Sequence, residues 1–168
     1  MTSAREPIVR VLLGDDHRIV REGLKMVLAE DPRIQVVAEA DTGPAVLDAV
    51  QNLQGPQGVD VALLDIAMPG MDGLDVLQML RRDWPALPVL MLSTYPEKQY
   101  AVRCIKLGAA GYLNKSTDPD ELMAVLHRVV VDEPPRRRSE PAIEVRDQRL
   151  DVPVEDDSNQ LRLRRKIN

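Results

Sequence analysis

The apolar residues of the chain fall into two alternating patterns, short continuous runs and stripes that recur every three or four positions. The runs cover residues 8–13, 34–38, 59–64, 89–92 and 109–113. The stripes, of which Val20, Leu24, Val27 and Leu28 are the first, have the spacing of amphipathic helices and lie within 20–28, 45–53, 74–80, about 96–107 and 122–129. The pattern predicts five strands that alternate with five helices.

Strands 59–64 and 89–92 are apolar at nearly every position, as strands covered on both faces are. Regular alternation of strands and helices implies right-handed crossovers between parallel strands. We therefore expect an α/β fold with a doubly wound parallel sheet between two layers of helices.

Polar residues with distinct chemistry come directly after four of the predicted strands. They are Asp15-Asp16, Asp65, Ser93 and Lys115. Parallel α/β sheets bind ligands beyond the carboxyl ends of their strands, so we expect these side chains to meet at one edge. Three converging carboxylates repel one another unless a cation or protons intervene, and Mg2+ prefers such oxygen ligands.

A phosphoryl group suits the remaining chemistry of these positions. Asp65 could attack phosphorus as a carboxylate nucleophile, which would give an acyl phosphate. Lys115 and Ser93 would then bind phosphoryl oxygens by charge and by a hydrogen bond. Each residue alone has an ordinary explanation as a turn, a cap or a surface charge, and only their joint placement favours a site. We expect His17, at the pocket entrance, to be neutral and partly exposed.

The same residues carry a family resemblance. Asp15-Asp16, Asp65 with the segment 68–73, Ser93 and the segment 111–115 resemble the receiver domain of bacterial two-component response regulators. The segments 15–17, 20–24 and 108–113 are similar to the NarL/FixJ subgroup, whose members usually carry a LuxR-type helix-turn-helix output. The resemblance covers about Val9 to Val131 and implies a flavodoxin-like (βα)5 receiver domain over residues 8–131, with strand order 2-1-3-4-5.

The resemblance also implies a role for each site residue. Asp65 would be the phosphoacceptor, receiving its phosphoryl group from a sensor histidine kinase. Asp16, Asp65 and the backbone carbonyl of Ala67 would bind Mg2+ directly, and Asp15 would bind it through water. Lys115 and Ser93 would bind the phosphoryl group.

Ser93 and Tyr112 would form a switch pair that changes a partner-binding surface. A homodimer, or a heterodimer with another response regulator, is the assembly that this implies. Many receivers have proline after the conserved lysine, whereas this chain has Ser116. We expect a trans peptide there because a cis bond before a residue other than proline costs about 2.5–4 kcal/mol.

Residues 132–168 differ in character from the rest, with a Pro- and Arg-rich stretch at 133–138 and no helical stripe. We expect a linker and an irregular, disordered tail. A helix-turn-helix output needs about 60 residues, so we expect no output domain and no DNA binding by this chain itself. The alternative is a DNA-binding transcription regulator of the NarL/FixJ type that acts through a partner or has lost its output domain.

Two further expectations concern the class of protein. A haloacid-dehalogenase-type phosphatase also uses an aspartate nucleophile with Mg2+, but it requires Asp-x-Asp, and Asp65-Ile66-Ala67 lacks the second aspartate. We therefore expect no turnover enzyme, only self-phosphorylation and slow self-dephosphorylation.

Composition excludes other classes and bears on location. The 13 Lys and Arg against 18 Asp and Glu in residues 1–131 give no basic footprint for nucleic acid. One cysteine, no signal peptide and no apolar stretch near the roughly 18 residues of a membrane span favour a cytoplasmic protein that makes no membrane contact.

Overall fold

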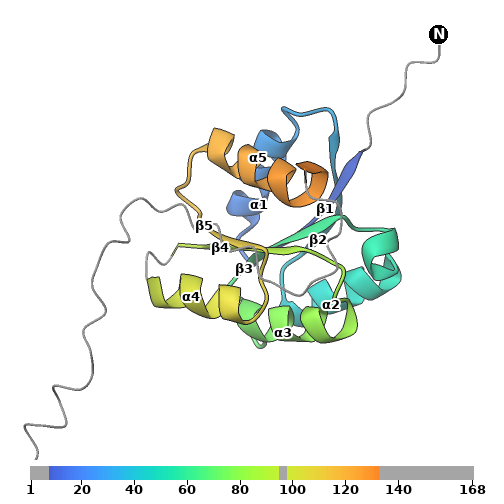
Figure 1. Ribbon diagram of the computed structural model, residues 1–168, viewed down its shortest axis with the longest axis vertical. Helices are drawn as coiled ribbons and strands as arrows, with labels where there is room; N and C mark the ends of the chain where they lie inside the picture. The colour runs from blue at the N-terminus through green and yellow to red at the C-terminus, as the bar shows by residue number, and fades with distance from the viewer. Residues whose placement is uncertain (1–7, 95–97, 133–168) are drawn as a thin grey trace, which may run out of the picture.

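The five predicted strands form one parallel sheet. The computed structural model describes residues 8–94 and 98–132. Its strands are ordered β2-β1-β3-β4-β5, which confirms the flavodoxin-like arrangement (Figure 1). Their bounds are β1 Val9–Gly14, β2 Ile34–Ala40, β3 Val61–Asp65, β4 Val89–Ser93 and β5 Gly111–Asn114.

Helices cover both faces of the sheet. Helices α1 and α5 lie on one face, and α2, α3 and α4 lie on the other (Figure 1). Their bounds are α1 Arg18–Leu28, α2 Gly43–Asn52, α3 Gly73–Asp83, α4 Lys98–Lys106 and α5 Pro119–His127, with short helical turns η1 at Gly55–Gln57 and η2 at Arg128–Asp132.

Successive residues of each central strand enter different cores, because strand side chains alternate between faces. Leu12 of β1 packs in the core under α2, α3 and α4, while its neighbours Val11 and Leu13 pack in the core under α1 and α5. Every residue of β3 and β4 is buried. The continuous apolar runs of these two strands are therefore explained by burial on both faces.

Local signals set the ends of several helices. The side chains of Thr42, Asp72 and Asp118 each accept a hydrogen bond from a backbone N–H in the first turn of α2, α3 and α5. Gly108, which follows α4, has a φ of 97°, a left-handed conformation that glycine adopts without steric cost.

The structure moves some predicted boundaries by one or two residues. The last strand begins at Gly111 rather than at residue 109, because the N–H of Ala109 bonds to Cys104 O and closes α4. Strand β3 begins at Val61, since Val59 N–H still bonds to the carbonyl of Gly55 in η1.

Two expectations concern residues that the structure does not describe. The predicted start of α4 near residue 96 and the predicted irregular tail from residue 133 onward lie outside the described residues. Within the described ranges, no helix combines the length and the apolar character that crossing a membrane requires.

Candidate functional site

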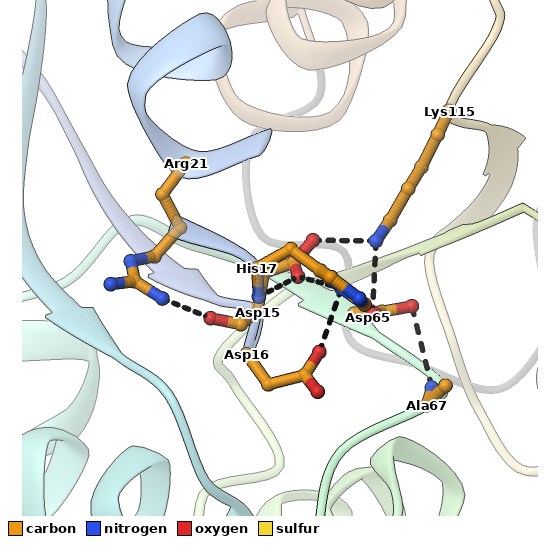
Figure 2. A network of polar contacts seen from close by, with 7 residues as sticks. All are labelled: Asp15, Asp16, His17, Arg21, Asp65, Ala67 and Lys115. Atoms are coloured by element: carbon orange, nitrogen blue, oxygen red, sulfur yellow. Dashed lines mark hydrogen bonds and ion pairs between the residues drawn. The ribbon is translucent and has the colours of Figure 1, made fainter. Parts of the chain in front are cut away.

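Two buried carboxylates meet one ammonium group at the carboxyl edge of the sheet. Asp15 follows β1, Asp65 ends β3 and Lys115 follows β5, so the order of the strands brings the three together (Figure 2). The Lys115 Nζ atom lies 2.6 Å from Asp15 Oδ2 and 2.9 Å from Asp65 Oδ2. The predicted convergence of these three residues is present.

These three side chains are nearly inaccessible to solvent. The exposed fraction is 3% for each carboxylate side chain and 9% for that of Lys115. Within the described residues neither Asp15 Oδ2 nor Asp65 Oδ2 accepts a well-directed hydrogen bond, so both depend on the charge of the lysine. One ammonium thus serves two buried carboxylates, which leaves an excess of negative charge in a region of low dielectric.

The pKa values of the two partners reflect this imbalance. Burial raises the pKa of Asp65, and the opposing contacts with Lys115 do not compensate for it; the nearby charge of Asp15 raises it further. Burial alone would lower the pKa of Lys115, but its contacts with Asp15 and Asp65 outweigh burial, and the pKa is raised. Lys115 is therefore charged at neutral pH, and Asp65 is the group whose ionisation is disfavoured.

Asp16 and His17 lie beside the two buried carboxylates, at exposed positions. The His17 Nδ1 atom lies 2.9 Å from Asp16 Oδ1 and 3.3 Å from Asp15 Oδ1 (Figure 2). One donor atom from each of Asp15, Asp16, His17 and Asp65 falls within 4.8 Å of the others. Three carboxylates at this spacing, two of them buried and sharing one ammonium, fit the oxygen ligands that Mg2+ takes.

The loop after β3 fixes the backbone of Asp65. The N–H of Ala67 donates to Asp65 Oδ1 over 3.3 Å, and Gly73 N–H bonds to Ile66 O over 2.7 Å. A Cβ atom on Gly73 would collide with the carbonyl oxygen of Asp65. Only glycine at position 73 therefore allows α3 to begin this close to the end of β3. Ala67, in the loop between them, is exposed to solvent.

Ser93 lies on β4, the strand next to β3, and Tyr112 lies on β5, the strand beyond it. Ser93 is the last residue of β4 and is fully buried, and its carbonyl accepts a hydrogen bond from Lys115 N–H over 2.8 Å. Tyr112 of β5 pairs with Met91 and is half-buried against the core under α4. No peptide bond among the described residues is cis, so the bond between Lys115 and Ser116 is trans, as expected.

Arg21 is a site residue that the sequence pattern did not single out. Its Nη1 atom donates to the carbonyl oxygen of Asp15 over 2.5 Å (Figure 2). Its Nε atom lies 3.4 Å from Glu39 Oε1 of β2. The side chain is only 16% exposed. The sequence feature that could have identified Arg21 is its place next to the apolar stripe of α1, from which a guanidinium can reach the preceding loop.

The sequence matches a known family over most of its length. The model of the response regulator receiver domain matches residues 11–127. The chain is 38% identical over 117 residues to the nitrate/nitrite response regulator NarP of Escherichia coli K12, covering 70% of this chain and 53% of NarP. It is 35% identical over 115 residues to the transcriptional regulatory protein DegU of Brevibacillus brevis, covering 68% and 47%. The chain therefore spans about half the length of these two curated relatives.

Solved structures agree with this assignment. The signal receiver domain of the response regulator NarL from Mycobacterium tuberculosis superposes with a TM-score of 0.66 at 38% identity, covering 74% of this chain and 98% of that one. A LuxR-family response regulator from Aurantimonas superposes with a TM-score of 0.69 at 28% identity, covering 75% and 87%. The sheet order, the acidic edge and these matches lead to one conclusion: the chain belongs to the receiver domain family of two-component response regulators.

Proposed function

We propose that this receiver accepts a phosphoryl group on Asp65 from a sensor histidine kinase and, when phosphorylated, changes a partner-binding surface. The observation that carries the proposal is the pair of buried carboxylates that share Lys115 at the carboxyl edge of the sheet. A fold does not need an excess of buried negative charge at this position, whereas a site that receives a cation and a phosphoryl group does.

In the proposed transfer, a carboxylate oxygen of Asp65 attacks the phosphorus atom of the donor phosphohistidine. The new P–O bond forms as the P–N bond breaks, and the electron pair of that bond leaves with the imidazole. The product on this chain is an acyl phosphate. Lys115, which lies 2.9 Å from Asp65 Oδ2, would exchange part of this contact for a phosphoryl oxygen and hold the charge that has arrived.

Mg2+ is the proposed cofactor, held by Asp16, Asp65 and the backbone carbonyl of Ala67 directly and by Asp15 through water. When bound, it would neutralise negative charge on the carboxylates and on the transferred group. The side chains of this chain have a separate task before transfer. Lys115 keeps Asp15 and Asp65 together, and the N–H of Ala67 orients the Asp65 carboxylate.

Ser93 and Tyr112 are the proposed switch. Ser93 is fully buried one residue beyond Leu92, the β4 residue that pairs with Asp65, so a small movement would bring its hydroxyl to a phosphoryl oxygen. Tyr112 lies on the adjacent strand and is only half-buried, so its ring has room to change position. The phosphoryl group would add a contact in one conformation only, and a population shift requires such a difference.

The experiment is phosphorylation by acetyl phosphate with Mg2+, followed by intact-mass measurement. We expect a phosphoryl adduct on the wild type and none on Asp65→Asn. Asp60→Asn is the matched control, because Asp60 precedes the same strand at its other end and pairs with Arg10. Equal labelling of Asp65→Asn and the control would contradict the assignment of the nucleophile.

A second candidate function is transcription regulation through a partner. DegU is a transcriptional regulatory protein and the Aurantimonas relative belongs to the LuxR family, and this chain matches only about half of DegU. In this form the phosphorylated receiver would dimerise with itself or with another response regulator, and the partner or a part beyond the receiver would contact DNA. Binding of DNA by this chain alone, decreasing as salt is raised, would favour direct regulation instead.

A further inference from the structure

An apolar groove lies between α1 and the start of α5, on the face of the sheet that these two helices share (Figure 1). Its cavity has a volume of about 310 Å3, and the aliphatic side chains that line it include Val20, Leu24, Val27, Leu113 and Leu122. That volume is at the lower end of the range for ligand sites. The proposed phosphoryl transfer uses none of these five side chains. The groove is therefore a candidate binding surface for aliphatic side chains from another segment.

Gly23 keeps the α1 wall of this groove open. It lies within the helix at an exposed position, and a Cβ atom built on it would meet no atom within 4 Å. Glycine destabilises a helix interior relative to alanine, and it allows another backbone to approach closely. Among the described residues no packing contact requires glycine at this position. A chain segment that lies against α1 would use the space.

The first turn of α5 gives the groove an acidic rim. Three exposed residues with carboxylates lie there, next to the loop residues that line the groove: Asp118, Asp120 and Glu121. Acidic residues in a first turn also stabilise the helix itself, so their charge alone does not indicate a ligand. On the α1 wall, Arg21 and Lys25 are each paired with Glu39 of β2. An apolar groove with such a rim favours an occupant that carries both aliphatic and basic side chains.

One segment of this chain has that composition. Residues 161–166, Leu-Arg-Leu-Arg-Arg-Lys, lie outside the described ranges and combine two leucines with four basic residues. We call them the basic segment. In an extended conformation Leu161 and Leu163 would be on one side and Arg162 on the other. The other basic run after residue 132, at 136–138, has no Leu, Ile or Val within four residues of it.

The chain is long enough for the basic segment to return to the groove. Asp132, the last described residue, comes 13 residues after Pro119 at the start of α5, or roughly 20 Å along the helix axis. The 29 residues from Asp132 to Leu161 would span roughly 43 Å even if all of them were helical. A tethered segment that can span the distance has an effective concentration that reaches the millimolar range. A contact that is weak between separate molecules would therefore form within one chain.

We propose that the basic segment docks in the groove between α1 and α5 of its own chain, with Leu161 and Leu163 in the apolar cavity and the basic side chains beside the acidic rim. The docked segment covers this face of the receiver, and another protein can use the face only after displacing it. The contact is autoinhibitory in that sense. The inference goes beyond the proposed function and does not depend on phosphoryl transfer.

The test measures paramagnetic relaxation in the NMR spectrum of the full chain. A nitroxide is attached through Asn159→Cys, next to the basic segment. Cys104 is fully buried, and burial raises its pKa to about 11, so it stays unlabelled at neutral pH. The amide signals of Gly23 and Thr117 should lose at least about half of their intensity, because a tethered contact of millimolar strength is populated in about half of the molecules. The amide signal of Gly58, at the amino edge of the sheet, should keep its intensity.

Two pairs of substitutions test the role of the leucines. Leu161→Ser with Leu163→Ser removes the apolar contacts and should reduce the intensity loss at Gly23 at least about threefold. Leu150→Ser with Val152→Ser is the matched control, because it makes a similar change at the same spacing around an acidic residue. The control should leave the intensity loss unchanged.

Charge reversal tests the acidic rim. Asp120→Lys with Glu121→Lys should weaken docking, and Arg164→Glu with Arg165→Glu should weaken it as well. All four substitutions together place opposite charges beside one another again, so they should restore most of the intensity loss. A combined variant no better than either pair would exclude the charge contact and overturn the proposed arrangement.

Gly23→Gln tests the groove from the α1 side. Its side chain enters open space, and glutamine favours a helix more than glycine does, so the urea midpoint should not fall. The side chain would occupy the mouth of the groove, so the intensity loss at Thr117 should disappear. A stable Gly23→Gln protein that retains the full intensity loss would show that the basic segment does not lie in this groove.

Two further outcomes would overturn the inference. The first is a wild-type chain without intensity loss at Gly23, or with a loss that Leu161→Ser and Leu163→Ser leave unchanged. The second is a loss that appears only between a nitroxide-labelled chain and a separate isotope-labelled chain, because the occupant would then be a second copy. All measurements are made without Mg2+ or a phosphodonor. Failure of Asp65 labelling therefore leaves the docking result standing, and absence of docking leaves the proposed function standing.

Discussion

The carboxylates at the two edges of the sheet differ in how well they are neutralised. At the amino edge, Asp60 is held by Arg10, and Asp31 receives hydrogen bonds from Arg33 and lies 2.8 Å from His127 Nε2. These hydrogen bonds, those from Arg33 above all, hold the pKa of Asp31 well below its usual range. At the carboxyl edge, Asp15 and Asp65 share Lys115, and burial raises the pKa of Asp65.

The comparison distinguishes charged groups that stabilise the folded chain from charged groups that destabilise it. A partnered carboxylate such as Asp31 is more stable ionised in the folded chain than in the unfolded one. The buried pair at the other edge is under-neutralised, and such an arrangement costs stability unless a ligand supplies positive charge. Polar groups that violate the rules of a stable interior in this way are expected at functional sites.

The largest expected effect comes from removing the shared cation. Lys115→Met leaves two buried carboxylates with no ammonium, so the free energy of unfolding in EDTA should fall by about 3–5 kcal/mol. Urea unfolding measures the loss, and added Mg2+ should restore part of it. Lys106→Met, on an exposed position of α4, is the control and should leave the urea midpoint unchanged. A Lys115→Met protein as stable as the wild type would contradict the dependence of the two buried carboxyl groups on this ammonium.

Removing one carboxylate charge from each edge of the sheet should change the free energy of unfolding in opposite directions. Asp65→Asn leaves Asp15 and Lys115 as a balanced pair, so the free energy of unfolding in EDTA should rise by about 2 kcal/mol. Asp60→Asn removes the partner of Arg10 and should lower it. Urea unfolding of both variants at pH 7 gives the comparison. A change in the free energy of unfolding in the same direction for both variants would contradict the distinction between the two edges.

The contribution of Asp31 should depend on pH. Its folded pKa is lowered, so its stabilising effect is present above the unfolded value of about 4 and is lost as the pH falls through the folded pKa. Asp31→Asn should therefore cost about 1.5 kcal/mol at pH 7, and the difference from the wild type should shrink below about pH 4. A difference that is constant with pH would mean that charge does not carry the effect.

The smallest expected effect concerns Arg21, which connects the site to β2. Its guanidinium is paired with Glu39, so its main effect on the pocket should be to hold the backbone of Asp15 rather than to repel a cation. Arg21→Met should weaken Mg2+ binding about threefold to tenfold with little change in stability. Arg21→Lys, which keeps one donor, should recover part of that affinity. Equal Mg2+ affinity in all three proteins would exclude a positioning role.

Much of the fold and of the site follows from local pattern. The strands 59–64 and 89–92 were evident from unbroken apolar runs, and their carboxyl ends marked Asp65 and Ser93. The boundary near Gly111 was less evident, because the small residues Ala109 and Ala110 suit a strand as well as the end of a helix. The hydrogen bond from Ala109 to Cys104 decided between them.

The sequence by itself determined the alternation of strands and helices and the positions of the acidic, hydroxyl and ammonium groups at strand ends. Periodicity and spacing are local properties, so they can be recognised without the fold. Only the tertiary structure decided that one lysine serves both Asp15 and Asp65 and that Arg21 pairs with Glu39 of the neighbouring strand β2. These contacts depend on which strands are neighbours and on side-chain directions, because charges far apart in the chain interact only where the packed sheet brings them together.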